Sequence, residues 1–199
     1  MAELNGNGAV AEWLRAHGAA DELRPVDRLV SACSHGDRAQ AERLLAERPV
    51  LREAIGPEHY VALHRAAEAG DVEAVALLLD CGLDPNRGDE EIGKTALHSA
   101  AMAGRPDVVR LLLARGASTE VRDREFNGQP LLWAAEGSRS HGERASEYAA
   151  VGRLLLAAGS PVEWTQPGSE PADGIREVLA EWQLGAKGAL GAASTAREG

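Results

Sequence analysis

Apolar positions along this chain recur in blocks spaced 34 residues apart. In the clearest block, residues 93–117, a short Ala-rich run ends at Gly104. A run rich in Val and Leu follows it and ends at Gly116. Nearly the same order of residues occupies 63–82, and residues 130–135 align with 96–101. Because a fixed period of this size is typical of repeat proteins, the pattern predicts small units that stack and bury their apolar faces against one another.

The clearest block predicts two short helices joined by a tight turn. Thr95 is a good N-cap for a first helix over residues 96–103, and Gly104 suits the left-handed conformation that ends many helices. Pro106 fits the first turn of a second helix, which Gly116 ends. Both helices are shorter than the roughly 12 residues that an isolated helix needs. Neighbouring units must therefore supply most of their stability.

The remaining units are less regular. Residues 26–51 keep the apolar register of a full unit, whereas residues 10–19 match only its second helix. The fourth unit carries about nine extra residues, which we place near residues 137–146, between its two helices. The sequence thus predicts one domain over residues 1–184 and a disordered Gly-, Ala- and Ser-rich tail over 185–199. Its expected parts are a half-repeat at 9–21, repeats at about 25–51, 57–88, 89–122 and 123–160, and a C-terminal cap helix at 173–183.

Composition and charge narrow the class of protein. The formal net charge of −10 argues against general nucleic-acid binding, which needs a basic surface. There is no apolar run of about 18 residues and no secretion signal at the start, so we expect a cytoplasmic protein that does not enter membranes. The bias towards Ala, Gly and Arg suggests a high-GC bacterium. Cys33 and Cys81 belong to separate predicted helices, far apart in the repeat order, and are expected to be buried, reduced thiols without a disulfide.

No familiar catalytic or metal-binding pattern accompanies the repeats. Residues 33–35 read Cys-Ser-His, but two side chains separated by two positions do not share a helix face, and no zinc-type spacing follows. Phosphate-binding loops, nucleophile elbows and His-Glu-x-x-His helices are also missing. We therefore expect no enzymatic activity, no cofactor and no metal.

The third unit resembles the ankyrin repeat. It keeps the family's residues at Gly93, Thr95, Leu97, His98, Ala100, Ala101, Gly104, Gly116 and Ala117, with Ala96 in place of the usual proline and a connecting finger one residue longer. The resemblance implies an all-α solenoid of helix-turn-helix units joined by hairpin-like fingers. It also implies that His98 and His64 are structural. His64 lacks the threonine partner, because Val61 and Ala62 replace the family's Thr-Pro.

The resemblance further implies a protein-binding scaffold that uses a concave face of finger tips and inner helices. The candidate contact residues carried over are Arg65, Glu68, Asp89, Glu90, Glu91, Ile92, Lys94, Ser99, Met102, Arg124, Glu125, Phe126, Trp133 and Glu136. Residues 52–91 hold ten acidic and three basic residues, a net charge of −7. Part of this stretch falls on the expected face, so we expect a basic protein partner.

The extra segment of the fourth unit supports an alternative function. Arg139, His141 and Arg144 are tentative site residues there, because beside Trp133 they could line a pocket for a small molecule or an enzymatic reaction. The chain is expected to be a monomer. Trp13 and Trp182 are expected to pack in the end helices, and a weak dimer through those helices becomes the better interpretation if either is exposed.

Overall fold

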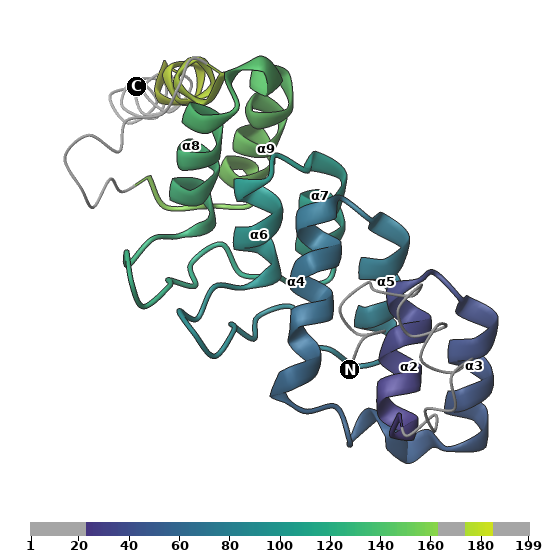
Figure 1. Ribbon diagram of the computed structural model, residues 1–199. Coiled ribbons are helices and arrows are strands. Elements are labelled where there is room, and N and C mark those ends of the chain that lie inside the picture. Colours follow the sequence, from purple (N-terminus) through teal and green to yellow (C-terminus); the bar gives the residue numbers. More distant parts are fainter. Residues whose placement is uncertain (1–22, 163–173, 185–199) are drawn as a thin grey trace, which may run out of the picture.

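The computed structural model describes residues 23–162 and 174–184, and Figure 1 shows these as helix-turn-helix pairs stacked in a curved row. The helices of the four pairs, in chain order, are α2 (Pro25–Ser34) and α3 (Arg38–Glu47), α4 (Tyr60–Ala69) and α5 (Val72–Asp80), α6 (Ala96–Met102) and α7 (Pro106–Ala114), and α8 (Pro130–Ser140) and α9 (Ala145–Ala157). Three short 3-10 helices, η2 (Pro49–Arg52), η3 (Pro57–His59) and η4 (Gly142–Arg144), lie between them. The described residues form helices and no strands, which confirms the all-α solenoid predicted from the sequence.

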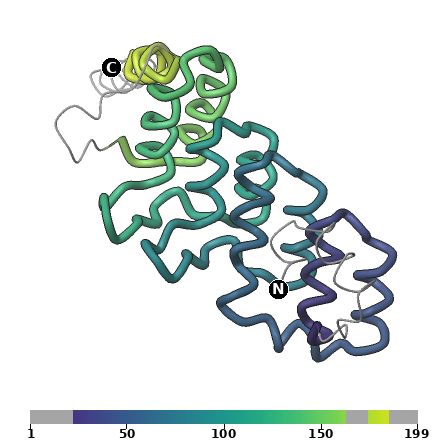
Figure 2. Tube along the Cα trace, in the orientation of Figure 1, coloured from purple at the N-terminus to yellow at the C-terminus, as the bar shows by residue number. Residues whose placement is uncertain are grey.

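The helices form two layers. The inner layer contains α2, α4, α6 and α8, and the outer layer contains α3, α5, α7 and α9 (Figures 1 and 2). Within each layer, α6 packs against both α4 and α8, and α7 packs against both α5 and α9. The fingers before α6 and α8 project from the inner-layer side of the row (Figure 2). The inner helices and the fingers therefore lie on the same side of the row.

The turns inside the pairs follow from the residues that the sequence marks. Gly70 and Gly104 have φ angles of +85° and +60°, in the left-handed region where a side chain is strained. Asp71 then caps α5, because its carboxylate accepts a hydrogen bond from the Ala74 amide at 2.9 Å. Pro106 begins α7. The predicted positions of Thr95 as N-cap and of Gly104 in the turn are confirmed.

Small side chains allow the inner helices to lie close together. Ala67, Ala101 and Ala135 occupy equivalent positions in successive repeats, and each is fully buried. The equivalent leucines at 63, 97 and 131 are also at most 1% exposed. Buried apolar residues of all four pairs form one continuous cluster. Stacking against neighbouring repeats therefore completes a core that a single repeat cannot form alone.

His98 ties the third repeat to the fourth. Its Nδ1 accepts hydrogen bonds from the backbone amide of Thr95 at 3.0 Å and from the Thr95 hydroxyl at 2.8 Å. Its Nε2 donates to the Gly128 carbonyl at 3.1 Å, at the end of the next finger. Burial lowers the pKa of His98 to about 4, so the ring is neutral at neutral pH. His64 is buried as well, with a lowered pKa for the same reason, and its Nδ1 lies 4.0 Å from Asp89 Oδ2.

The fourth repeat differs from the expected loop insertion. Its extra residues lengthen the helices instead, because α8 runs on to Ser140 and α9 begins only five residues later. Gly137 and Ser138 are buried, and a Cβ at Gly137 would collide with the Met102 carbonyl. The start of this segment thus belongs to the packed scaffold and is not a dispensable surface loop.

A helix over residues 174–184 closes the end of the row, where Ile175, Val178 and Leu179 are buried (yellow in Figure 1). Trp182, which we expected to pack, is 44% exposed. The predicted half-repeat at 9–21, with Trp13, and the predicted tail at 185–199 lie outside the described residues.

The cysteines are closer together than the sequence suggested. Cys33 of α2 and Cys81, which follows α5, are both buried free thiols, and their Sγ atoms lie 2.8 Å apart. The expectation that they are far apart is wrong, because α2 packs against the outer helix of the next repeat as well as against its own partner.

We expect His98 to make folding sensitive to acid. Its pKa is about 4 in the folded chain and about 6.5 when unfolded, so the unfolded state binds the extra proton first. The stability that neutral His98 contributes is present above pH 6.5 and is lost as the pH falls towards 4, by up to about 3 kcal/mol. Urea unfolding of His98→Gln at several pH values should show lower stability at pH 7 but a shallower decline below pH 6.5. The exposed His141→Gln variant is the control, and an unchanged slope in His98→Gln would contradict the assignment.

Candidate protein-binding face

Asp123 organises the finger before α8. Its carboxylate accepts hydrogen bonds from the backbone amides of Glu125, Phe126 and Gly128 and from the Trp133 indole, at 2.6 to 2.9 Å. Burial alone would raise the pKa of Asp123, but these donors outweigh it and hold the pKa below its ordinary value. Asp89 has a similar role in the preceding repeat, where it accepts hydrogen bonds from the amides of residues 92 and 93. Both aspartates therefore shape fingers.

Arg124 joins the two fingers. Its backbone amide donates to the Ile92 carbonyl at 2.6 Å, and its guanidinium donates to the carbonyls of Asp89 and Glu90 at 3.0 and 2.9 Å. Because charged donors bind carbonyls strongly, this bridge braces the fingers against each other. The two fingers are thus ordered within the chain itself.

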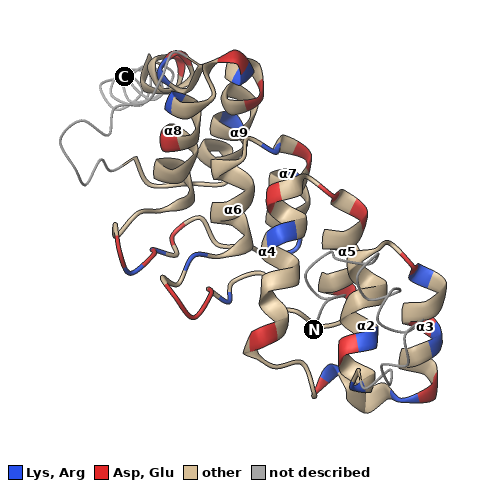
Figure 3. Cartoon of the chain, in the orientation of Figure 1, with Lys and Arg blue, Asp and Glu red and all other residues tan. Residues whose placement is uncertain are grey.

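Only some of the acidic stretch reaches this face. Glu90 and Glu91 are exposed in the finger before α6, and Glu125 is exposed in the finger before α8. Figure 3 shows acidic residues on both of these fingers. Asp71 caps α5, and Asp80 pairs with Arg115 at 2.7 Å on the outer layer. The net charge of residues 52–91 therefore overstates the negative charge on the fingers, because part of it lies on the outer layer.

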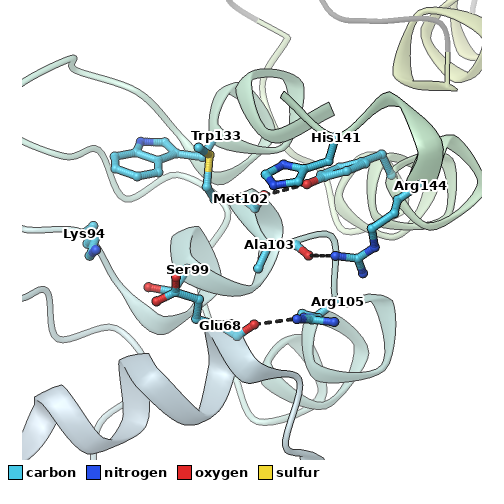
Figure 4. A pocket seen from close by; sticks show the side chains of 10 residues that line it. Glu68, Lys94, Ser99, Met102, Ala103, Arg105, Trp133, His141 and Arg144 are labelled. Carbon is cyan, nitrogen blue, oxygen red and sulfur yellow. Dashed lines mark hydrogen bonds between the residues drawn. The ribbon is translucent and has the colours of Figure 1, made fainter. Parts of the chain in front are cut away.

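A hollow of about 290 Å³ opens between α6, α8 and the segment that leads into α9 (Figure 4). Its lining combines apolar, hydroxyl, imidazole, basic and acidic side chains, namely Glu68, Lys94, Ser99, Met102, Ala103, Arg105, Trp133, His141, Arg144 and Tyr148. Ser99 is 5% exposed, and its hydroxyl has no hydrogen-bond partner among the described residues. Buried hydroxyls of this kind are usually hydrogen-bonded, so the Ser99 hydroxyl is a polar group that an occupant of the hollow can bind.

Trp133 forms one wall of the hollow and is fixed in place. Its indole nitrogen donates to Asp123 at 2.9 Å, and its ring meets His98 and Phe126 edge to face, with centroids 5.8 and 6.1 Å apart. The Lys94 ammonium lies 6.0 Å from the ring centroid. The half-buried indole thus offers a rigid apolar surface beside a positive charge.

The opposite wall supports the ends of the inner helices. Arg144 donates to the carbonyls of Ala103 and Gly104, both at 2.8 Å, and Tyr148 donates to the Met102 carbonyl at 2.8 Å. The guanidinium of Arg105 likewise bonds to the Glu68 carbonyl at 2.8 Å (Figure 4). These carbonyls lack partners inside their own helices, so Arg144, Tyr148 and Arg105 stabilise helix ends.

The sequence-derived candidates divide between the hollow, the fingers and exposed helix positions. Those in the hollow are Glu68, Lys94, Ser99, Met102, Trp133, His141 and Arg144. Those in the fingers are Asp89, Glu90, Glu91, Ile92, Arg124, Glu125 and Phe126. Arg65 is exposed on α4, and Glu136 pairs with Arg139 on α8. Arg105 and Tyr148 also line the hollow but were missed, because neither belongs to a repeated motif.

We expect Asp123→Asn to loosen the fourth finger. The new amide nitrogen cannot accept the hydrogen bonds now made to one carboxylate oxygen, so stability should fall by about 2 kcal/mol and the Trp133 emission should shift to the red. Asp107→Asn is the charge-matched control, since the Asp107 side chain is 73% exposed and its ion pair in the described part of the chain is with Arg110; it should cost less than about 1 kcal/mol. Equal losses in the two variants, measured by urea unfolding, would show that Asp123 does not organise the finger.

No helix among the described residues is long and apolar enough to cross a bilayer. Among curated proteins, none matches the sequence. The family described as "Ankyrin repeats (3 copies)" matches residues 29–123 and again residues 63–146, which together make up more than half of the chain. The repeats that the family match covers include both braced fingers and the helices that form the hollow. The chain therefore belongs to the ankyrin repeat family.

Proposed function

We propose that the chain is a non-catalytic protein-binding scaffold whose partner docks on the concave face of the third and fourth repeats. Ankyrin repeats are in general protein–protein interaction modules, and this supports the class of function. The observation that carries the location is the hollow beside Trp133, which two braced fingers flank.

The chemistry of this face suits a protein partner. Trp133 and Met102 are half-buried and Phe126 is 44% exposed, so apolar surface remains available next to charged groups. Aromatic residues and methionine are enriched in protein interfaces, and a few such residues carry most of the binding free energy. Because the fingers are already braced, binding loses little conformational entropy. We assign the anchoring contact to a partner side chain that enters the hollow against Trp133.

The charge of the finger tips supports a partner with lysine or arginine residues. Glu90 and Glu91 are both exposed, and Glu125 lies exposed on the neighbouring finger. Closer to the helices, the positive charges of Lys94 and Arg124 offset part of this negative charge. The proposed attraction of a basic partner is therefore confined to the finger tips. Complementary charge of this kind acts mainly on the association rate.

Small-molecule binding is the second candidate, and the hollow is the observation that favours it. Its volume of about 290 Å³ is at the lower limit of typical ligand pockets. Against it, Arg105, Arg144 and Tyr148 already bond to backbone carbonyls, so few polar groups converge on an occupant. No group of three or more potential metal ligands occurs within residues 23–162 and 174–184. A single partner side chain therefore fits the site better.

The proposal extends to the setting of the protein. We place it in the bacterial cytoplasm. Because Trp182 is 44% exposed, the expected monomer gives way to a weak dimer through the end helix, which light scattering during size exclusion would detect at high concentration.

We expect affinity capture by the full chain, followed by kinetics with the purified partner, to separate the two contributions. Glu90→Lys with Glu91→Lys should slow association about tenfold at low salt and weaken its salt dependence. The double variant Glu42→Lys with Glu47→Lys makes the same charge change on α3 and is the control. Trp133→Ala should speed dissociation at a cost of about 2 kcal/mol, whereas Trp182→Ala should not. Equal effects of test and control variants would contradict docking on this face.

A further inference from the structure

Two buried thiols meet where the first described repeat packs on the second. Cys33 lies on the inner helix α2 and Cys81 directly follows the outer helix α5, 48 residues further along the chain. Their Sγ atoms are 2.8 Å apart, and the residues are 0% and 2% exposed. The proposed binding face uses neither residue, so their chemistry is independent of that proposal.

The equivalent positions of the next repeats show that this contact is particular to one interface. Thirty-four residues on, Cys33 corresponds to Ala67 and Cys81 corresponds to Arg115. Ala67 carries no reactive group, and Arg115 pairs outward with Asp80. The equivalent contact between the second and third repeats therefore contains no cysteine, whereas the contact between the first and second contains two.

The surroundings distinguish the two thiols. The Sγ atoms of Cys33 and Cys81 lie within hydrogen-bond distance, and either thiol can be the donor. This hydrogen bond lowers the pKa of Cys81, and the positive charges of Arg52 and Arg38 act in the same direction. Arg52 is held near Cys81 by a hydrogen bond to the Asp80 carbonyl at 3.4 Å. The Arg52 guanidinium is held on the Cys81 side of the pair, where its positive charge favours a thiolate, the reactive form of cysteine. On this geometry we assign Cys81 as the nucleophile and Cys33 as the resolving thiol.

We propose that Cys33 and Cys81 form a redox site, at which a low-molecular-weight disulfide oxidises them to a cross-link between the two repeats. The Cys81 thiolate attacks one sulfur of the oxidant, which breaks its S–S bond, releases one thiolate and leaves a mixed disulfide on Cys81. Cys33 then loses its proton and attacks the Cys81 sulfur, displacing the second thiolate. Two electrons pass to the oxidant, and the two cysteine protons end on the two thiols released.

The packing of the array controls access to this site. Neither sulfur is exposed in the closed structure, so a bulky oxidant reaches them only when α2 separates from α5. In a solenoid a repeat is held only by its neighbours, and a segment of the array opens more easily than the whole chain unfolds. The cross-link prevents that same separation. Oxidation therefore fastens the first described repeat to the second.

The test uses the full chain under native conditions in a buffer of reduced and oxidised glutathione. We expect intact-mass measurement to show the loss of two hydrogens per chain, and peptide mapping to show a disulfide between Cys33 and Cys81. The Tm should rise by about 5 to 10 °C on oxidation and return to its starting value with dithiothreitol. The reduced wild-type chain is the reference, so this comparison does not depend on a variant that folds poorly.

Two matched variants complete the test. Cys33→Ser should stop at one glutathione on Cys81, and Cys81→Ser should leave Cys33 unmodified on the same timescale, with no rise in Tm in either case. The proposal is overturned if the wild-type chain keeps two free thiols, takes up two glutathiones or forms cross-linked dimers. It is also overturned if the intramolecular disulfide forms without a rise in Tm.

Discussion

Packing between neighbouring repeats is the interaction on which the rest of this structure depends. α6 has seven residues and α7 has nine, so neither is long enough to persist alone in water. Fully buried alanines let the inner helices approach closely, and the leucines beside them fill the core. His98 adds a directed contact, because it fixes the start of its own helix and holds the next finger. Each repeat thus both receives support from its neighbours and gives support to them.

This dependence determines which residues remain for function. Several groups that the sequence suggested as site residues are bonded to the scaffold: Asp89 closes its finger, Arg124 joins the two fingers, and Arg144 stabilises the end of α6. Asp123, which was not among the sequence-derived candidates, closes the next finger in the same way. The surface that remains is the hollow beside Trp133 and the exposed glutamates at the finger tips. The fingers and helix ends that complete the scaffold also form the proposed concave face. The proposed function therefore depends on a combined surface and not on a single reactive residue.

The sequence predicted the features that repeat and missed those that occur once. The two-helix units, the cap at Thr95 and the left-handed Gly104 follow from local rules, and the structure confirms them. The contact of Cys33 with Cys81 joins an inner helix to the outer helix of the next repeat, a relation that a 34-residue alignment does not reveal. Tyr148 was missed for a similar reason: its hydrogen bond to Met102 exists because the extra residues lengthen α8 and α9.

The account's central claim is that the scaffold leaves the concave face of the third and fourth repeats for partner binding. Hydrogen–deuterium exchange of the full chain, with and without its captured partner, tests this claim most directly. The account predicts slower exchange on binding in residues 89–94 and 123–128, the two fingers, with little change in α5, α7 and α9. Protection confined to those outer helices, with unchanged exchange in both fingers, would contradict it.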